Sequence, residues 1–415
     1  MKVKFQRWWE IFKREVWFRR LPHGLIHWRY LLPRPERRIR AHRKIWWHSG
    51  QRWPRPLWLA VEVFLWVRWV FYYAWITSWR SAQLWKMQES LGLSTRSALE
   101  GFAKGLYLAL AWCIPPGDAR RFGLFESPDQ ATDFVYDHEV HAYHDLRNQP
   151  RGCQKASLRL LQDKSALSDF LIAQGIPMAP IIAVIPRGDV RPLSALISSD
   201  GVFFCKMRSG NQGRGAFTAW RERGCWKGRT FHGQVLETPE SVESVWRSLL
   251  MLDDALIQPY LMNHPDLAAL AFDQQTVTIR LISTWDSDGL SCLLSTLEVP
   301  THSDAKTQTT LYTILPIRSD TGQVVSWPNE RPLPAQAQEA TQQILNKIPQ
   351  GWAIPHWHAL VEASFKAHAT FPDIRSIAWD WAITPEGPRL LEGNSGWGAS
   401  LPQQRLGGFL RDGII

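Results

Sequence analysis

The order of hydrophobic and polar residues divides the chain into three regions. Residues 2–55 alternate basic and aromatic side chains, as in KFQRWWEIFKREVWFRR. Residues 57–79, LWLAVEVFLWVRWVFYYAWITSW, form a nearly unbroken apolar run that is long enough to cross a bilayer as a helix. After residue 155, short segments with helix-like and strand-like patterns alternate. The pattern predicts a helical N-terminal region, followed by a part that mixes helices and strands.

The apolar run leaves three interpretations open. Glu62 and Arg68 interrupt it, and each would cost roughly 3 kcal/mol near the centre of a bilayer. Trp and Tyr favour the membrane–water interface, and Lys and Arg are attracted to anionic headgroups. We therefore favour a helix that lies on or in one leaflet, and a true span and a helix buried in the protein are the alternatives. A secretory signal is not expected, because the run starts late and no small-residue cleavage site follows it.

Composition strengthens the membrane interpretation of the N-terminal region. The chain has 415 residues, enough for two or three domains. Residues 1–90 hold 13 of its 24 tryptophans and carry 19 Lys/Arg against 5 Asp/Glu, a net charge of +14 where the whole chain has +10. We expect an anionic membrane surface, contacted through residues 1–80, and no nucleic acid as partner. The five cysteines are scattered, which fits a reducing cytoplasm and a location at the inner face of the membrane.

Residues 164–220 suggest a site for phosphate. A helix-like segment ends at Gly175, and 201–220, GVFFCKMRSGNQGRGAFTAW, predicts two strands joined by a flexible loop that follows Lys206. Glycines in this loop would let backbone N–H groups close around a phosphate. The loop is not a Walker A motif, because GK[ST] is missing. Taken alone, a glycine-rich loop is more often an ordinary hairpin loop than a phosphate site.

Two further segments add candidate contacts. ALIQPYLMNHP (255–265) predicts a short buried strand that breaks at Gln258-Pro259-Tyr260, where backbone groups could face an adenine ring. TVTIRLIST (276–284) alternates as a strand and carries Arg280. A strand arginine most often pairs with a carboxylate, so a phosphate contact depends on the surrounding motifs.

The C-terminal segment RSIAWDWAITPEGPRLLEGN predicts a hairpin that brings two carboxylates together. Pro385 and Gly387 suit a three-residue loop in which Thr384 pairs with Pro388. That register places Asp380 directly opposite Glu392, with Asn394 two residues further along on the same face. Like charges in opposed positions destabilise a sheet, and carboxylate and amide oxygens suit Mg²⁺. We therefore predict a metal site formed by Asp380, Glu392 and Asn394, with an exposed acidic hairpin as the alternative.

Taken together, these motifs resemble the ATP-grasp superfamily, and more narrowly its sugar-transfer-associated family. The resemblance runs from about Asp163 to Gln404 and rests on DIRSIAWDWAITPEGPRLLEGN, YLMNHPDLAALAFDQQTVTIRLIST and KMRSGNQGRG. It implies an α+β protein with the ATP-grasp fold, in which two α+β lobes enclose ATP. Residues 1–150 contribute little to it and lack a GxGxxG start, so we expect a helical, membrane-facing region there.

The resemblance also implies roles for individual residues. Lys206 and Arg280 would be catalytic, and Asp380, Glu392 and Asn394 would bind one or two Mg²⁺ ions, with Mn²⁺ as an alternative. Nucleotide contacts would come from Lys164, Lys206, the flap residues Gly210, Gly213, Arg214 and Gly215, and the hinge residues Gln258 and Tyr260. Residues 298–310, EVPTHSDAKTQTT, lack the Asp-Asn and paired glycines associated with relatives, which leaves the substrate contacts open.

The activity that the resemblance implies is ligation. The γ-phosphoryl group of ATP would pass to a carboxylate, and an amine or another nucleophile would attack the acyl phosphate, releasing ADP and phosphate. A role in cell-envelope or exopolysaccharide biosynthesis would suit the family and the N-terminal region. The alternatives are a kinase that phosphorylates a hydroxyl and a nucleotide-binding membrane adaptor with little turnover.

The expected domain organisation has four segments. Residues 1–90 form the basic membrane-associating segment, and 91–160 a helical N-terminal lobe or linker. Residues 161–259 form the small ATP-grasp lobe with its flap, and 260–415 the large lobe with the metal site.

Overall fold

The chain folds into two compact units. The computed structural model describes residues 9, 12–24, 30, 33–51, 53–90, 98–210, 213–272, 275–304, 309–326 and 335–411. Unit 1 consists of Met1–Pro150 together with Gly396–Ile415, and unit 2 of Arg151–Ser395. The four predicted segments stay a prediction. The structure adds that residues 396–411 pack with the N-terminal unit.

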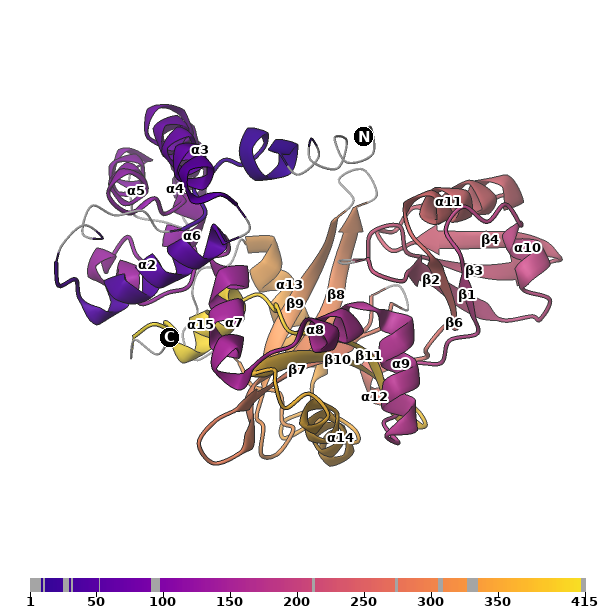
Figure 1. Cartoon of the computed structure of the whole chain (residues 1–415). Coiled ribbons are helices and arrows are strands. Elements are labelled where there is room, and N and C mark those ends of the chain that lie inside the picture. The colour runs from indigo at the N-terminus through magenta and orange to yellow at the C-terminus, as the bar shows by residue number, and fades with distance from the viewer. Residues whose placement is uncertain are drawn as a thin grey trace. The chain divides into compact units, whose positions relative to one another are not determined.

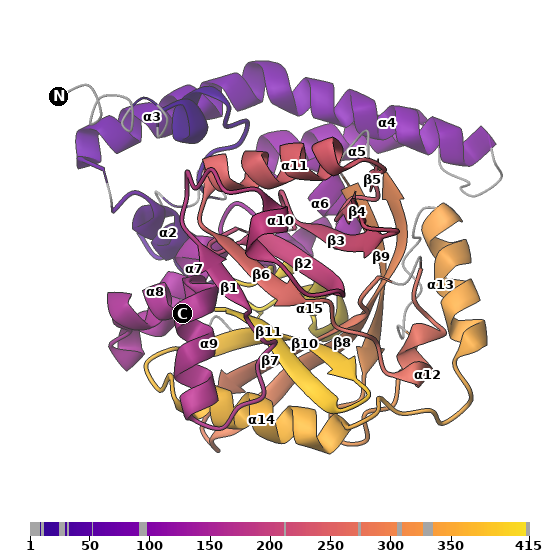
Figure 2. The ribbon, with the colours of Figure 1, turned by 90° about the vertical axis from the view of Figure 1, so that its right-hand side faces the viewer.

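The regular secondary structure in the described part of unit 1 is helical. Its α-helices are α2 (Arg37–Ser49), α3 (Arg55–Arg68), α4 (Ala74–Ser90), α5 (Ala98–Trp112), α6 (Pro116–Arg121), α7 (Val140–Asn148) and α15 (Ser400–Leu406). A π-helical turn at Trp69–Tyr73 joins α3 to α4 without a break, so residues 55–90 form one long helical rod (Figure 2). The apolar run of the sequence therefore forms a helix, which packs against α5 and α6.

The C-terminal residues complete unit 1 by hydrogen bonds to residues 133–135. The Gln403 side chain accepts a hydrogen bond from Val135 N–H and donates one to the Val135 carbonyl, both at 2.7 Å. Leu410 N–H donates to the Asp133 carbonyl at 2.8 Å. These bonds satisfy backbone groups that are buried in the unit.

One part of unit 2 is a small lobe built on a six-stranded sheet (Figure 1). Its strands are β1 (Ala183–Ile185), β2 (Val202–Met207), β3 (Phe217–Glu222), β4 (Cys225–Thr230), β5 (Val235–Leu236) and β6 (Ala255–Pro259), in the order β1-β6-β2-β3-β4-β5. The short helix α10 (Leu193–Leu196) and α11 (Pro239–Leu252) pack with this sheet. Thr238 and Ser241 form a capping box at the start of α11, and the buried Trp246 anchors the helix in the lobe's apolar core.

The large lobe of unit 2 is a five-stranded antiparallel sheet with helices. Its strands are β7 (Thr278–Trp285), β8 (Leu290–Asp304), β9 (Thr309–Ile317), β10 (Ser376–Thr384) and β11 (Gly387–Asn394), in the order β11-β10-β7-β8-β9. The accompanying helices are α8 (Lys155–Gln162), α9 (Lys164–Ala173), α12 (Pro265–Ala268), α13 (Ala335–Lys347) and α14 (Trp357–Ala369). Strand β10 is buried at all nine positions, and one apolar core joins α8, α9 and α14 to the sheet. Two antiparallel sheets with helices confirm the predicted α+β class.

Candidate active site

The β10–β11 hairpin pairs the two predicted metal-binding carboxylates. Asp380 lies opposite Glu392, which confirms the predicted pairing. The predicted loop is wrong: Thr384 pairs with Gly387, so only two residues form the turn. A register shift between Asp380 and Trp381 compensates, because Leu391 is an extra residue on β11. The bulge adds the residue that the shorter loop lacks, and the two carboxylates still face each other.

Arg280 lies beside Asp380 on the neighbouring strand β7. Its Nε donates to Asp380 Oδ1 at 2.7 Å and its Nη2 to Oδ2 at 2.9 Å, a bidentate ion pair. Its Nη1 lies 3.2 Å from Oε1 of Glu298 on β8. The Asp380 carboxylate raises the pKa of Arg280, so the guanidinium stays charged. Burial raises the pKa of Glu298 to about 7.

Lys164 is the first residue of α9 and points to the same carboxylates. Asp163 caps the helix by accepting hydrogen bonds from the N–H groups of Ser165 and Ala166 at 3.2 and 3.1 Å. The Lys164 Nζ donates to the Gly210 carbonyl at 2.5 Å and lies 3.4 Å from Glu392 Oε2. One ammonium group therefore connects the start of the predicted flap to a predicted metal ligand.

Arg208 fastens the two lysine-bearing segments together. It follows Lys206 by two residues at the end of β2, and it forms a bidentate pair with Asp163 at 2.8 and 2.7 Å. Its Nη1 also lies 3.2 Å from Asp254 Oδ2. Because Asp163 caps α9, this contact sets the end of β2, where Lys206 lies, against the helix that carries Lys164.

Lys206 is the cation of the cluster whose pKa is lowered. Burial lowers its pKa to about 8, against the opposing attraction of Glu392. Burial also acts to raise the pKa of Glu392, but Lys164 and Lys206 outweigh it, and the net shift is downward. Asn394 Nδ2 donates a hydrogen bond to Glu392 Oε1 at 3.2 Å. The amide oxygen of Asn394 could therefore serve as a ligand of a cation.

The charges of this cluster balance. The three cationic side chains are those of Lys164, Lys206 and Arg280. The three anionic side chains are those of Asp380, Glu392 and Glu298. Within the described residues, no group of three or more His, Cys, Asp and Glu side chains is suited to a metal, and the predicted trio has two carboxylates and an amide. Oxygen donors of this kind fit Mg²⁺ that keeps water and phosphate ligands. A balanced cluster attracts bare Mg²⁺ only weakly, so we expect the ion to bind together with nucleotide phosphates.

A cavity of about 540 Å³ adjoins the cluster. Lys206, Gln258 and Tyr260, all predicted contacts, line it together with Leu391 of the bulge. Its wall is otherwise largely aromatic or apolar, with Phe204, Trp220, Phe231, Met262 and Tyr312. The size and lining suit a nucleotide whose base is held by apolar side chains.

The predicted hinge and flap residues have a less direct relation to the cavity than Lys206 has. Tyr260 N–H donates to the Val202 carbonyl at 2.8 Å, so Tyr260 can offer its ring and carbonyl to a base but not this amide. Gly213, Arg214 and Gly215 form the turn between β2 and β3, and Arg214 is exposed. None of these three lines the cavity. The remainder of the predicted flap, residues 211–212, falls outside the described part of the chain.

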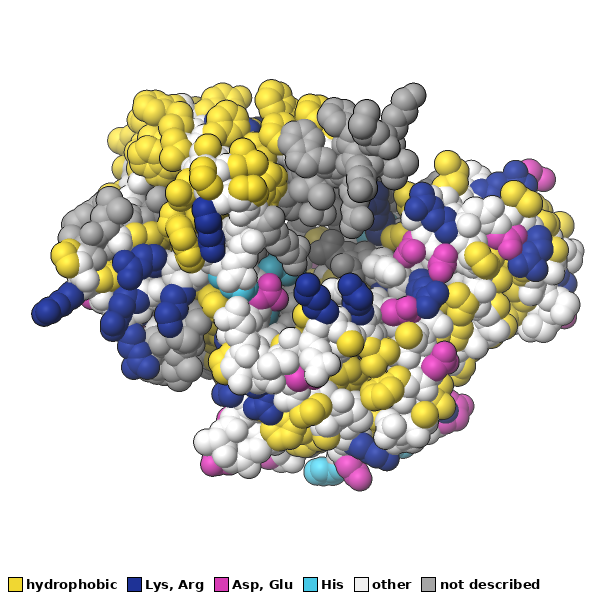
Figure 3. Space-filling model, in the orientation of Figure 1, with side chains coloured by type: hydrophobic (Ala, Val, Ile, Leu, Met, Phe, Trp, Pro, Cys, Tyr) yellow, Lys and Arg dark blue, Asp and Glu magenta, His cyan; other side chains and the backbone are white. Residues whose placement is uncertain are grey.

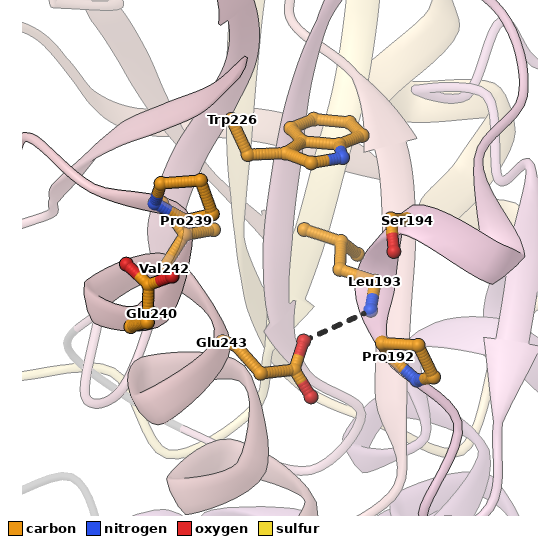
Figure 4. Close-up of a pocket in the computed structure, with 8 residues that line it drawn as sticks. All are labelled: Pro192, Leu193, Ser194, Trp226, Pro239, Glu240, Val242 and Glu243. Atoms are coloured by element: carbon orange, nitrogen blue, oxygen red, sulfur yellow. Dashed lines mark hydrogen bonds between the residues drawn. The ribbon is translucent and has the colours of Figure 1, made fainter.

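A second, smaller hollow lies within the small lobe. It measures about 240 Å³ and is lined by residues of α10, β4 and α11, among them Trp226 and Glu243 (Figure 4). Glu243 Oε2 accepts a hydrogen bond from Leu193 N–H at 3.1 Å. No predicted site residue lines this smaller hollow. The candidate active site is therefore the larger cavity with its charged cluster.

Residues 146–411 match the model of the family described as sugar-transfer associated ATP-grasp. The chain belongs to this family. Its fold is the ATP-grasp fold, and enzymes of the superfamily use ATP and typically Mg²⁺. No curated protein matches the chain in sequence.

Several solved ligases are similar in structure at low identity. D-Alanine–D-alanine ligase from Helicobacter pylori is 13% identical, with 60% of this chain and 58% of that chain covered and a TM-score of 0.35. VanG D-Ala:D-Ser ligase from Enterococcus faecalis is 11% identical, with 62% and 59% covered and a TM-score of 0.37. D-Alanine–D-alanine ligase from Bacillus anthracis is 14% identical, with 70% and 81% covered and a TM-score of 0.38. The chain thus spans less than two thirds of the first two of these neighbours.

Sequence reasoning missed three features of the site. Glu298 was noted only as part of a divergent segment, although its position on β8 beside Arg280 follows once β7 and β8 are paired. The Arg208–Asp163 contact joins residues 45 apart, and no local pattern marks it. The aromatic lining was missed because Trp220 and Tyr312 lie on separate strands with no shared motif.

Proposed function

We propose that this protein is an ATP-dependent ligase that activates a carboxylate as an acyl phosphate. The observation that carries the proposal is the convergence of Lys164, Lys206 and Arg280 on Asp380 and Glu392 beside a nucleotide-sized cavity. Phosphoryl transfer depends on positioning and on neutralising charge more than on a covalent catalyst. The cluster offers both.

Each residue type has a role in this chemistry. Lys206 and Lys164 would contact phosphate oxygens of ATP, and Arg280 would stabilise the charge on the transferred γ-phosphoryl group. Asp380, Glu392 and Asn394 would hold Mg²⁺, which supplies additional positive charge to the phosphates when bound. The turn from Gly210 to Gly215 would cover the phosphates and exclude water that hydrolyses an acyl phosphate.

The reaction ends with attack on the acyl phosphate. An amine or another nucleophile forms a bond to the carbonyl carbon, and phosphate leaves with the bonding electrons. The family's description names an association with sugar transfer, and the basic, Trp-rich N-terminal segment suits a membrane surface. Together they support our proposal that the acceptor or carboxylate is a precursor of envelope or exopolysaccharide synthesis, handled at the inner face of the membrane.

Release of labelled phosphate from γ-labelled ATP tests the proposal. Purified protein with Mg·ATP is screened against amino acids and sugar acids, in the presence and absence of amine acceptors. Free phosphate that appears only with a carboxylate and an acceptor supports a ligase. A stable phosphorylated product would show a kinase, and no turnover with any pair would favour an adaptor; either result overturns the proposal.

Asp380→Asn is the first variant to measure. It keeps the shape of the side chain but removes the charge that Arg280 and a metal share, so we expect a loss of turnover of about 100-fold or more. Asp320→Asn is the matched control, because Asp320 is exposed and pairs with Arg318 at 2.7 Å outside the cluster. Normal turnover by Asp380→Asn would refute the metal assignment.

A further inference from the structure

The helical rod of residues 55–90 exposes many large apolar side chains on the sides away from its buried stripe. Phe71 is 76% exposed and Val63 62% exposed. We call the following residues the apolar face: Leu57, Leu59, Val63, Phe64, Trp66, Val67, Phe71, Tyr72, Trp75 and Trp79 of the rod, with Leu99, Tyr107 and Leu110 of α5. Figure 3 shows hydrophobic side chains gathered over the region where Figure 1 places α3, α4 and α5. A patch of this kind on a protein marks a binding surface.

The opposite side of the rod is built into unit 1. Trp58, Glu62, Leu65 and Trp69 are buried, and their spacing of three and four residues puts them on one side of a helix. Trp69 Nε1 donates to the Ala109 carbonyl at 2.7 Å. Only 22% of the most apolar 18-residue window is buried. A helix buried in the protein, one of the three interpretations, therefore does not describe this segment.

Both charges that interrupt the apolar run are held by unit 1. Glu62 is 2% exposed; its carboxylate accepts from Trp46 Nε1 at 2.8 Å and lies 2.5 Å from His23 Nδ1. Arg68 donates to the carbonyls of Val16 and Trp17, both at 3.2 Å. Neither charge needs to enter lipid when the apolar face does.

These contacts distinguish a helix lying in one leaflet from a span. The rod between 55 and 83 is long and apolar enough to cross a bilayer by length and composition. A span would surround the rod with lipid and would pull Glu62 out of its hydrogen bonds at a cost of several kcal/mol. An in-plane helix keeps the buried side in protein and places the exposed side among acyl chains.

The charge of the surrounding segment selects the partner. Residues 1–90 carry a net +14, and Arg20 and Arg80 are exposed. A second copy of this segment would bring like charges together. An anionic lipid surface complements the charge, and Trp and Tyr prefer the interface that such a helix would occupy.

We propose that unit 1 docks on anionic bilayers as a monotopic module, with the apolar face inserted in one leaflet and the rod parallel to the membrane. The proposal does not depend on the ligase activity, because every residue that carries it belongs to unit 1.

Flotation of the full-length protein with vesicles tests the docking. Vesicles of phosphatidylcholine alone are compared with vesicles that contain phosphatidylglycerol. We expect binding to the anionic vesicles to be at least about tenfold stronger, and to weaken with salt. Equal binding to both, or binding to neither while the protein forms dimers in solution, would overturn the proposal.

Paired variants locate the surface. Val63→Glu/Phe71→Glu changes two exposed residues of the apolar face, and we expect at least about a tenfold loss of vesicle binding. Val190→Glu is the matched control, because Val190 is 85% exposed in unit 2 and should leave vesicle binding unchanged. An unchanged calorimetric transition of unit 1 shows that the double variant is folded. Equal losses in both variants would overturn the assignment of the surface.

Brominated lipids report the orientation. An in-plane helix places its tryptophans at shallow depth, so bromine near the headgroup end of the acyl chain should quench tryptophan emission more than bromine deeper in the chain. Stronger quenching from the bilayer centre would show a span and overturn the in-plane orientation.

Discussion

The guanidinium of Arg280 contacts the carboxylates of both Asp380 and Glu298. This arrangement suggests that Glu298 positions Arg280. Asp380 is a predicted metal ligand, so Mg·ATP bound as proposed would compete with Arg280 for its oxygens. Glu298, 3.2 Å from Nη1, would then be the remaining anion that holds the guanidinium in place. Glu298 is a positioning residue in this account, since it acts through Arg280.

The pH dependence of turnover tests that role. Burial raises the pKa of Glu298 to about 7, so the residue loses its charge as the pH falls below 7. We expect wild-type kcat to fall on that acid side and Glu298→Gln to show about a tenfold lower kcat with the acid limb removed. KM for Mg·ATP should change little. An unchanged acid limb in Glu298→Gln would rule out this role.

His368 contributes to stability as a neutral side chain. The Ser283 hydroxyl donates to its Nδ1 at 2.6 Å and its Nε2 donates to the Ile374 carbonyl at 3.0 Å, while Trp379 Nε1 donates to Ser283 Oγ at 2.9 Å. Burial lowers the pKa of His368 to about 4. This network supports β10 at the position next to Asp380.

Acid should therefore lower the stability of unit 2 at pH values where His368 of the folded protein is still neutral. The unfolded chain takes up the proton near pH 6.5 and the folded chain only near pH 4, so stability is lost as the pH falls between these values. The expected loss from His368 is about 2 kcal/mol at pH 5. Urea unfolding at pH 7.5 and 5 should show His368→Gln less stable at pH 7.5 but with a smaller loss on acidification. Equal losses in variant and wild type would contradict this assignment.

At the scale of a single element, the turn between β2 and β3 contains two glycines whose substitutions can be compared. Gly213 and Gly215 both have left-handed backbone angles, φ +66° and +70°, so alanine strains each by about 1 kcal/mol. A Cβ on Gly213 would lie 2.2 Å from a ring carbon of Phe231, whereas one on Gly215 would meet nothing. Phe231 lines the cavity.

Gly213→Ala should therefore weaken ATP binding more than Gly215→Ala. The displaced Phe231 ring reshapes the cavity wall, and we expect Kd for ATP to rise about tenfold for Gly213→Ala and less than about threefold for Gly215→Ala. Calorimetric titration with Mg·ATP measures both. Similar effects of the two substitutions would show that backbone strain, and not the ring, is responsible.

The β10–β11 hairpin illustrates how far the sequence predicts an element. Alternation along the strands and the turn residues predicted two strands and the pairing of Asp380 with Glu392. The same reasoning placed the loop one residue too long and missed the bulge at Leu391. Turn rules place Pro385 and Gly387 in a loop, but a bulge depends on how β11 meets the remainder of the sheet, and no local pattern contains that information.

At the scale of the whole molecule, the two units have separate apolar cores. We therefore expect them to unfold in separate steps. The cores of unit 2 and the core around Phe122 and Tyr136 of unit 1 share no residue. Mg·ATP binds to unit 2 in the proposal, so its addition should raise one calorimetric transition by about 5 °C and leave the other in place. A single transition, or an equal rise in both, would contradict this expectation.

The organisation of the units was the least predictable feature. The family resemblance ran from about Asp163 to Gln404, which covers most of unit 2. The expected large lobe of residues 260–415 stays a prediction, and the structure groups residues 396–411 with unit 1. The decisive contacts, such as those between Gln403 and Val135, join residues 268 apart. Such contacts follow from the packed structure and leave no signature in the nearby sequence.

The return of the chain from Asn394 to unit 1 has a consequence for synthesis on the ribosome. Unit 2 has all of its residues once Ser395 has been translated, whereas the hydrogen bonds of Gln403 and Leu410 to residues 133–135 must wait for later codons. The rod and its apolar face leave the ribosome first, and domains tend to fold as they emerge. All residues of unit 2 are therefore synthesised before the residues that complete the unit with the apolar face.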